Sequence, residues 1–403
     1  MSGRIHSLDS LRGISALIVL IHHCLLMTPL FYAAHYNEPY NNWVVSLFDN
    51  TILHTVWAGS EAVLLFFVLS GFVLALPFLS FKNNYSYGDY IIKRICRIYI
   101  PYISVMTIAV LLMVFIADYH GHTGLMDSFS ERRWAHPLSL EAAISYIIML
   151  GYDNTNVNGP TWSLVHEMRI SFFFPFLMLL VIKFDWKKAI ILGFGGSMFF
   201  WLVFYVMNIF IDNGFTSAVI NSFKDTFFYT TFFIIGALFA KNYKNILPLF
   251  NKIKSLNKIF LFLIALILFN FEDVFPFFQK FHGIVGLGIN LGVEWIAAIG
   301  VLIIFTFAIS SQPFNKLLTK PVFKWLGKVS YSLYLVHMVV LITMMYTLGK
   351  IIPVYIALSF VPIISILFAA ITHKFIEKPA QNLGNYLVNK KKRSEKIPQK
   401  QIV

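Results

Sequence analysis

The stretch LRGISALIVLIHHC at residues 11–24 places an arginine and two histidines in an otherwise apolar run. An α-helix advances about 100° and about 1.5 Å per residue, so Arg12 and His23 lie on nearly one face, about 16 Å apart. His22 points about 80° away from Arg12 and is expected to pack against a neighbouring helix. Because an imidazole with its ordinary pKa of about 6.5 exchanges protons near neutral pH, His23 is a candidate catalytic base. The alternative is a structural histidine that hydrogen-bonds another helix.

A second group of polar residues occurs in KRICRIYIPY, residues 93–102. Arg94 and Arg97 are three residues apart and therefore share a helix face. Two guanidinium groups there can hold phosphate oxygens through paired hydrogen bonds, and a helix N-terminus adds partial positive charge. The alternative is simple anchoring among lipid headgroups.

A third segment, NGPTWSLVHEMRISFFFP at residues 158–175, places charged groups inside another apolar run. Glu167 and Arg169 are two residues apart and point to different faces, so each is expected to find its partner on another helix. Trp162 fits an interfacial aromatic belt or a ring that stacks on a sugar. Ser163 is a further candidate for a supporting role.

A fourth segment, GKVSYSLYLVHM at residues 327–338, carries Tyr334 and His337 on a shared helix face. Buried tyrosines usually pack with the hydroxyl satisfied, so a structural role competes with a supporting one here. The stretch SEAVLLFFVLSGFVL, residues 60–74, adds Glu61 near one end of its apolar run.

Apolar helices must position these groups, because 58% of the 403 residues are hydrophobic and the mean hydropathy is +0.71. Such a composition predicts an all-α, polytopic integral membrane protein, with about 20 residues in each span. Ten spans are predicted, at about residues 12–30, 60–79, 98–117, 162–182, 189–210, 226–240, 259–272, 288–311, 329–348 and 352–373. Residues 140–151 are apolar but short, and they predict an interfacial or re-entrant helix.

The net charge of +13 is distributed unevenly among the loops between these spans. With the N-terminus in the cytoplasm, the other side receives only Arg132, Arg133, Lys224, Lys280 and Lys350. The positive-inside rule therefore predicts that both termini are cytoplasmic, and it accounts for the charge without nucleic acid as a partner. A cell inner (cytoplasmic) membrane is the expected location.

The chain is predicted to contain one membrane domain, residues 1–380, followed by a basic cytoplasmic tail, residues 381–403. The tail is almost free of apolar residues and is predicted to be disordered. Cys24 and Cys96 are expected to be free, because one lies inside the first span and the other beside the arginines. A thiol nucleophile at Cys24 is an alternative to a packing role.

Together these stretches resemble the acyltransferase-3 family of integral membrane acyltransferases. Five motifs carry the resemblance, which continues to FIEKP at residues 375–379: LDSLRGISALIVLIHH, LLFFVLSGFVL, KRICRIYIPY, TWSLVHE and KVSYSLYLVH. One departure is Leu64, which stands where many relatives have an acidic residue, while Glu61 lies three positions earlier.

The resemblance implies transfer of an acyl group, commonly acetyl from cytoplasmic acetyl-CoA, to a hydroxyl of a glycan or lipid-linked saccharide. It implies that His23 is the catalytic histidine and that Arg12 and the Arg94/Arg97 pair handle the donor. Glu167 matches the glutamate that follows the TWSL motif and is expected in the site. No metal is expected.

Two routes remain open for His23, which can deprotonate the acceptor hydroxyl or accept the acyl group itself. Asp9 or Glu167 is a candidate for orienting its imidazole. Arg12, Tyr334 or a backbone amide is a candidate for stabilising the oxyanion.

Other classes of protein also place charges inside a membrane. A transporter or flippase for a glycan or metabolite would line its pathway with them, and a sensor or scaffold would use the histidines structurally. Neither needs a phosphate-suited entrance together with a base in the membrane, and this pairing favours acyl transfer. The sequence carries no signal for an oligomeric state.

Overall fold

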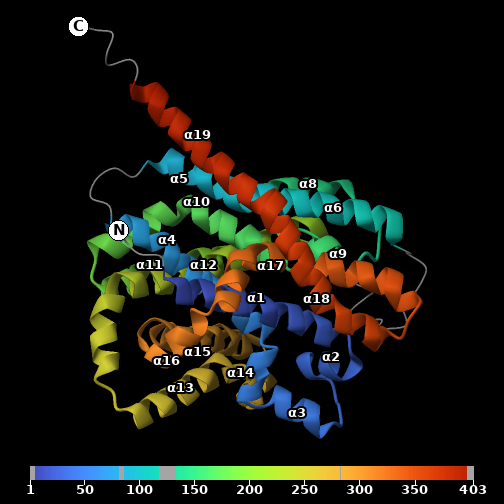
Figure 1. Ribbon diagram of the computed structural model, residues 1–403, viewed down its shortest axis with the longest axis horizontal. Coiled ribbons are helices and arrows are strands. Elements are labelled where there is room, and N and C mark those ends of the chain that lie inside the picture. The colour runs from blue at the N-terminus through green and yellow to red at the C-terminus, as the bar shows by residue number, and fades with distance from the viewer. Residues whose placement is uncertain (1–4, 81–85, 118–132, 282, 397–403) are drawn as a thin grey trace.

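The structure of the protein is a computed structural model that describes residues 5–80, 86–117, 133–281 and 283–396. All regular structure within these ranges is helical (Figure 1). Residues 118–132, between two of the predicted spans, and residues 397–403 of the predicted tail lie outside the described residues. The prediction of an all-α polytopic membrane protein is confirmed.

Nine helices in the described ranges are long and apolar enough to cross a membrane. They are His6–Leu26 (α1), Gly59–Ser80 (α4), Tyr87–Ile116 (α5, η2 and α6), Thr161–Lys183 (α10), Trp186–Ile209 (α11), Gly214–Asn251 (α12), Gly286–Ser310 (within α15, Gly283–Ser310), Pro321–Lys350 (α17 and η4) and Val354–Lys391 (α18, η5 and most of α19). The predicted span at 259–272 corresponds to α13, Ser255–Phe269, which has 15 residues. At about 1.5 Å per residue this helix is shorter than the roughly 30 Å of a hydrocarbon core.

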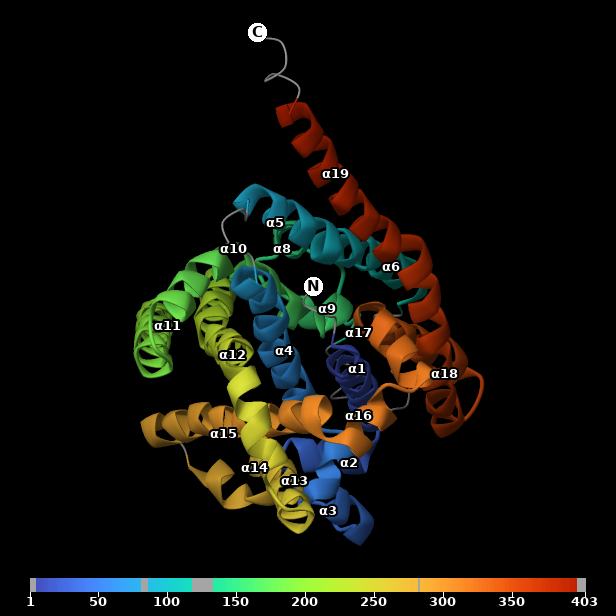
Figure 2. The ribbon, with the colours of Figure 1, turned by 60° about the vertical axis from the view of Figure 1, so that its left-hand side comes forward.

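Short helices connect the spanning ones. They are α2 (Pro29–His35), α3 (Trp43–Asp49), η1 (Ile52–Val56), α8 (Leu140–Ile148), α9 (Asn154–Asn158), α14 (Phe271–Val274), η3 (Pro276–Lys280) and α16 (Gln312–Leu318). With nine residues, α8 is too short to span a bilayer, as predicted for residues 140–151. Figure 2 shows α2, α3, α13 and α14 gathered on one side of the molecule.

The first helix lies at the centre of the molecule and packs against α17 and α4 (Figure 2). The contact between α1 and α17 is close because it is formed by two glycines. A Cβ atom added to Gly13 would lie 2.6 Å from the backbone nitrogen of Gly327, and one added to Gly327 would meet the backbone of Asp9. Small residues let helix backbones approach in this way inside a membrane.

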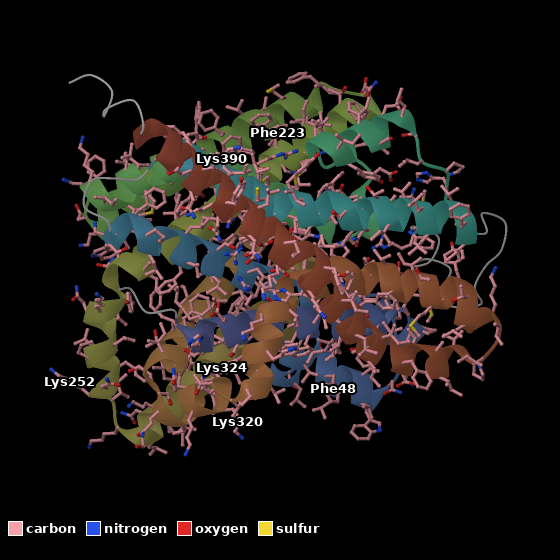
Figure 3. The ribbon with its side chains drawn as sticks, turned by 45° about the horizontal axis from the view of Figure 1, so that its top comes forward. Phe48, Phe223, Lys252, Lys320, Lys324 and Lys390 are labelled. Carbon is pink, nitrogen blue, oxygen red and sulfur yellow. The ribbon has the colours of Figure 1, made fainter. Side chains whose placement is uncertain are left out.

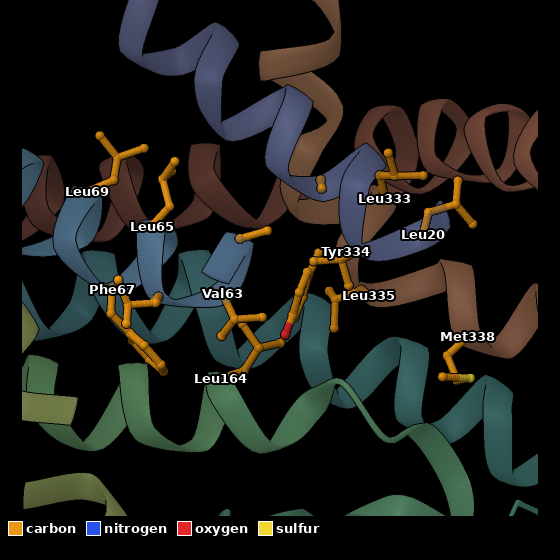
Figure 4. Packing of buried hydrophobic residues seen from close by; sticks show 14 of the residues in the cluster. Leu20, Val63, Leu65, Phe67, Leu69, Leu164, Leu333, Tyr334, Leu335 and Met338 are labelled. Carbon is orange, nitrogen blue, oxygen red and sulfur yellow. The ribbon is translucent and has the colours of Figure 1, made fainter. Parts of the chain in front are cut away.

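Apolar side chains from α1, α4, α10 and α17 belong to one buried cluster (Figure 4). Leu20, Val63, Leu164 and Tyr334 come from these four helices and are buried. The motifs that the sequence places far apart therefore converge on one packed core.

The predicted disorder of the tail from residue 381 is wrong as far as Lys396, because α19 runs from Lys378 to Lys396. Ala380 and Val388 are buried, and a Cβ on Gly384, between them in sequence, would touch Cys96. These positions are four residues apart and form one face of the helix. This small-residue face packs against α5 and η2, which explains why a basic segment is ordered.

Basic side chains lie at intervals along the molecule. In Figure 3 the labelled Lys252, Lys320, Lys324 and Lys390 lie in the left half of the view, and Phe48 lies in the right half. The orientation of the termini stays a prediction, because helix length and composition do not distinguish the two sides of a membrane.

Candidate active site

The two histidines with the closest contact in the site come from α1 and α17. Nε2 of His337 lies 3.2 Å from Nδ1 of His23, and the ring centroids are 5.1 Å apart. Nδ1 of His23 also lies 2.9 Å from the carbonyl oxygen of Val19, and Nδ1 of His337 lies 3.1 Å from that of Leu333. The sequence had predicted that His337 shares a face with Tyr334, and it had not predicted this contact.

These contacts define where the protons lie in the neutral rings. A carbonyl oxygen only accepts hydrogen bonds, so Nδ1 of each ring must be the donor. Nε2 of His337 is then an acceptor. The Nδ1–H of His23 is shared between this nitrogen and the carbonyl oxygen of Val19. Nε2 of His23 keeps its lone pair and has no hydrogen-bond partner in the described part of the chain, so it is available as a base or nucleophile.

His22 has a different environment from His23. Its Nδ1 lies 2.8 Å from the carbonyl oxygen of Trp57, and its ring stacks on the Trp57 ring at 5.7 Å between centroids. A Cβ on Gly59 would collide with the His22 ring. The expectation that His22 packs against a neighbouring element, while His23 faces elsewhere, is confirmed.

The group that orients His23 is not one of the carboxylates considered from the sequence. Asp9 precedes His23 by fourteen residues in α1, which is about 21 Å along the helix. Glu167 is hydrogen-bonded to Arg94 and Ser70 instead. Val19 and His337 make the contacts to Nδ1 of His23.

Arg12 is held by α17. Its Nε donates to Oγ of Ser330 at 2.9 Å, and its Nη2 donates to the carbonyl oxygen of Gly327 at 3.2 Å. Nη1 makes no hydrogen bond to the described residues. The close approach of Gly13 and Gly327 brings the backbone of α17 within reach of this side chain.

Arg94 is engaged inside the protein. Its Nη2 lies 2.9 Å from Oε1 of Glu167, and both Nε and Nη2 donate to Oγ of Ser171. Oγ of Ser70 donates to the same glutamate oxygen at 3.2 Å. The expectation that Glu167 has its partner on another helix is confirmed, since α5 supplies it. Nε and Nη2 of Arg94 are thus bound within the protein, whereas Nη1 makes no hydrogen bond to the described residues.

Arg97 is oriented differently because it lies within a π-helical turn, Ile95–Tyr99, which begins directly after Arg94. Such a turn bonds each residue to the fifth one along, which changes the angular spacing from that of an α-helix. Arg97 lines a cavity and makes no hydrogen bond or ion pair with the described residues. Arg94 bonds to Glu167, which lines the same cavity, so joint binding of a phosphate by the two arginines stays a prediction.

The cavity next to Arg97 has a volume of about 60 Å³. Four helices and the π-helical turn contribute to it, and its polar lining consists of Arg12, Ser70, Arg97, Ser163, Glu167, Ser330, Tyr331 and Tyr334. The cavity thereby brings together five residues predicted from motifs that lie far apart in the chain, which are Arg12, Arg97, Ser163, Glu167 and Tyr334. Ser70 and Ser330, which hold Glu167 and Arg12, were not predicted, because isolated serines in apolar helices give no distinct sequence signal.

Tyr334 connects the cavity with the two histidines. Its hydroxyl lies 2.7 Å from Oγ of Ser163 and 3.1 Å from the carbonyl oxygen of Pro160. Its ring centroid is 5.8 Å from that of His337, and Figure 4 shows the tyrosine extending from α17 toward Val63 and Leu164. The predicted supporting residues Ser163 and Tyr334 therefore contact each other.

Trp162 lines a second cavity of about 180 Å³. Tyr229, Glu61, Glu272 and Glu294 also line it, and the rings of Trp162 and Tyr229 are 5.4 Å apart. Aromatic rings and hydrogen-bond acceptors in one cavity suit a ligand that bears hydroxyl groups.

Arg169 has its partners on other elements, as predicted. Nη1 donates to the hydroxyls of Ser222 and Thr226 on α12, and Nη2 donates to the carbonyl oxygen of Met149. These bonds give Arg169 a structural role. Both cysteines, Cys24 and Cys96, are free, as predicted.

The fold and the site define a polytopic membrane protein with an arginine-lined internal cavity and a histidine pair between its helices. The chain belongs to the acyltransferase family whose sequence profile, described as "Acyltransferase domain", matches residues 5–372. This match confirms the resemblance inferred from the five motifs.

One curated relative is the protein "O-acetyltransferase PaAT-1" of Phomopsis amygdali, which is 27% identical over 139 residues. The match covers 32% of this chain and 26% of that protein. This chain thus spans about a quarter of the relative that it matches. No solved protein structure matches the chain.

Proposed function

We propose that this protein is a membrane O-acyltransferase that moves an acetyl group from acetyl-CoA to a hydroxyl of a glycan or lipid-linked saccharide. The observation that carries the proposal is the His23–His337 contact, which leaves Nε2 of His23 with its lone pair. The family and the relative's name support acyl transfer in general.

The donor enters, in this proposal, from the end of the bundle that carries Arg12 and Arg97. Arg97 is the arginine of the motif that has no protein partner in the described ranges, so its whole guanidinium group is available for a phosphate oxygen. A cavity of about 60 Å³ is far too small for CoA, so most of the donor would lie outside it.

The proposed reaction uses His23 as a general base. Nε2 removes the proton of the acceptor hydroxyl, the oxygen attacks the thioester carbonyl carbon, and the C–S bond breaks to release CoA thiolate, which takes up the proton. His337 accepts the Nδ1–H of His23 and so favours the positively charged ring that forms. The same lone pair can attack the thioester directly, giving an acyl-histidine that the acceptor then resolves.

The oxyanion formed on the carbonyl needs a donor close to the cavity. Arg12 lies about 16 Å from His23 along α1, too far to reach a carbonyl that reacts at Nε2 of His23. Of the side chains considered, Tyr334 is the nearer donor, because its ring centroid is 5.8 Å from that of His337, which contacts His23.

The acceptor is proposed to use the second cavity, where Trp162 and Tyr229 can stack on a sugar ring. With both termini in the cytoplasm of the cell and the chain in its inner membrane, this cavity opens away from the donor side. A transporter or flippase would use the same cavities without consuming acetyl-CoA.

The test is transfer of radiolabelled acetyl groups from acetyl-CoA into membrane glycans and lipids. Wild type is compared with His23→Ala and with His136→Ala, which removes an exposed histidine outside the site. Label should appear with wild type and His136→Ala and be lost with His23→Ala. Equal labelling in all three removes His23 from the mechanism, and no labelling with any of them rejects acetyl-CoA as donor.

A further inference from the structure

A cluster of potential metal ligands lies at the opposite end of α1 from Arg12, between η1 and α14. Asp49 ends α3, His54 lies in η1 and Asp273 lies in α14. One ligand atom from each residue lies within 4.8 Å of the others. Side-chain exposure is 15% for Asp49, 5% for His54 and 19% for Asp273.

The described residues do not satisfy all the polar atoms of this cluster. His54 Nδ1 lies 4.0 Å from Oδ1 of Asp49, and His54 Nε2 lies 3.4 Å from Oδ2 of Asp273. Neither Nδ1 of His54 nor Oδ2 of Asp273 has a hydrogen-bond partner, although both atoms are buried. An unpaired buried polar atom is destabilising, so a bound group at this position would stabilise the fold.

Acidic side chains surround the cluster, since Glu61 and Glu272 lie near enough to Asp273 to interact with it electrostatically. Within the described ranges, no lysine or arginine forms an ion pair with Asp49 or Asp273.

The distances between the atoms suit ligands of one ion better than direct hydrogen bonds. Nitrogen and carboxylate ligands about 2.0–2.2 Å from a metal stand roughly 3–4 Å apart. One ring nitrogen binds one ion, and the three ligand atoms lie within 4.8 Å of one another, so a movement of about 1 Å brings the set into range. The Tyr40 hydroxyl donates to Oδ2 of Asp49 at 2.8 Å, which orients that carboxylate and leaves Oδ1 for the metal.

We propose that Asp49, His54 and Asp273 bind one divalent first-row transition metal ion, with Zn²⁺ as the expected occupant and Mn²⁺ as the alternative of the same class. A neutral imidazole with two carboxylates matches the ligand preference of these ions, whereas Ca²⁺ and Mg²⁺ prefer oxygen alone. The ion would join η1 to the turn after α13. The proposal of a metal site departs from the expectation of no metal, and it does not depend on the proposed acyl transfer.

The ion would also support the second cavity. Phe271 and Glu272, which line that cavity, precede Asp273 directly in the chain. Asn270, at the start of the same turn, donates to Oγ1 of Thr55, next to His54. The metal and this hydrogen bond would therefore hold the same two segments together.

The test uses full-length protein in detergent, freed of any affinity tag and of metal by a chelator. Zn²⁺, Mn²⁺, Ca²⁺ and Mg²⁺ are titrated separately, and bound metal is measured by elemental analysis after desalting, alongside Tm. The variants are His54→Gln and Asp273→Asn, with Asp212→Asn as the control because Asp212 is exposed and outside the cluster.

Wild type and Asp212→Asn should each bind one equivalent of Zn²⁺ and gain Tm with it, and both cluster variants should lose the equivalent. Tyr40→Phe keeps all three ligands and should weaken Zn²⁺ binding by about 10- to 100-fold. This variant tests the site even if the other two variants do not fold. The proposal is overturned if wild type shows no saturable Zn²⁺ or Mn²⁺ site, or if Tyr40→Phe and the cluster variants bind as wild type does.

Discussion

Nε2 of His337 lies 3.2 Å from Nδ1 of His23, although 314 positions separate the two residues in the chain. The contact joins the first helix to the second-last long apolar helix and determines which nitrogen of His23 keeps its lone pair. Since His337 reaches the proposed reacting atom only through His23, it is a positioning residue.

Replacing His337 tests this relay. In His337→Ala the Nδ1–H of His23 keeps the carbonyl of Val19 but loses its second acceptor. We expect kcat for acetyl transfer to fall by roughly 10- to 100-fold, with little change in KM for acetyl-CoA and a shifted pH profile. Steady-state rates across pH measure both effects. His337→Asn, whose side-chain oxygen can accept the same hydrogen bond, should recover part of the rate; equal loss in both variants with an unshifted profile would point to packing alone.

The two arginines of the KRICR segment are expected to differ in function. Arg97→Ala should weaken donor binding by at least about tenfold and leave stability near that of wild type, because Arg97 has no protein partner in the described ranges. Binding of a CoA analogue and Tm of the purified protein separate the two effects. Arg97→Lys keeps the charge and should restore part of the affinity. Unchanged affinity in a folded Arg97→Ala protein would contradict the proposed phosphate contact.

Arg94→Ala should act mainly on stability. It leaves Glu167 without its guanidinium partner in a pair whose side chains are 10% and 20% exposed, and breaking such a pair costs about 3–5 kcal/mol. Arg94→Ala combined with Glu167→Gln should recover part of the lost Tm, because no unpaired charge is left. A Tm equal to wild type in the single variant would show that the pair contributes little.

The contact of α1 with α17 sets the position of Arg12 and His23 together. Gly13→Ala would place a Cβ 2.6 Å from the nitrogen of Gly327, so the helices must separate. We expect a large drop in Tm and in activity. Gly195→Ala on α11 is the matched control, since nothing lies within 4 Å of the added Cβ and alanine favours a helix by about 1 kcal/mol. Equal thermal stability of the two variants would show that α1 and α17 tolerate a wider spacing.

Local properties of the chain were sufficient to predict the helices and the direction in which some side chains point. Long apolar runs predicted the spanning segments, because backbone groups in hydrocarbon must be satisfied within each helix. The spacing of Arg12 and His23 along one helix predicted their common face, and the difference between His22 and His23 followed from the same geometry. One helix in the described ranges was not predicted correctly: the tail up to Lys396 is helical, because Ala380 and Val388 find a packing surface on α5 and η2. The predicted span at 259–272 corresponds to the 15-residue helix α13.

Pairings between helices required the tertiary structure. Whether Arg94 or Arg97 is free depends on a π-helical turn and on Ser171 and Glu167 from α10, which no spacing within the KRICR motif reveals. The acceptor for the Nδ1–H of His23 was expected to be a carboxylate and is His337. The physical reason is that periodicity defines which face of a helix a residue occupies, whereas packing of non-adjacent helices decides which groups meet across that face.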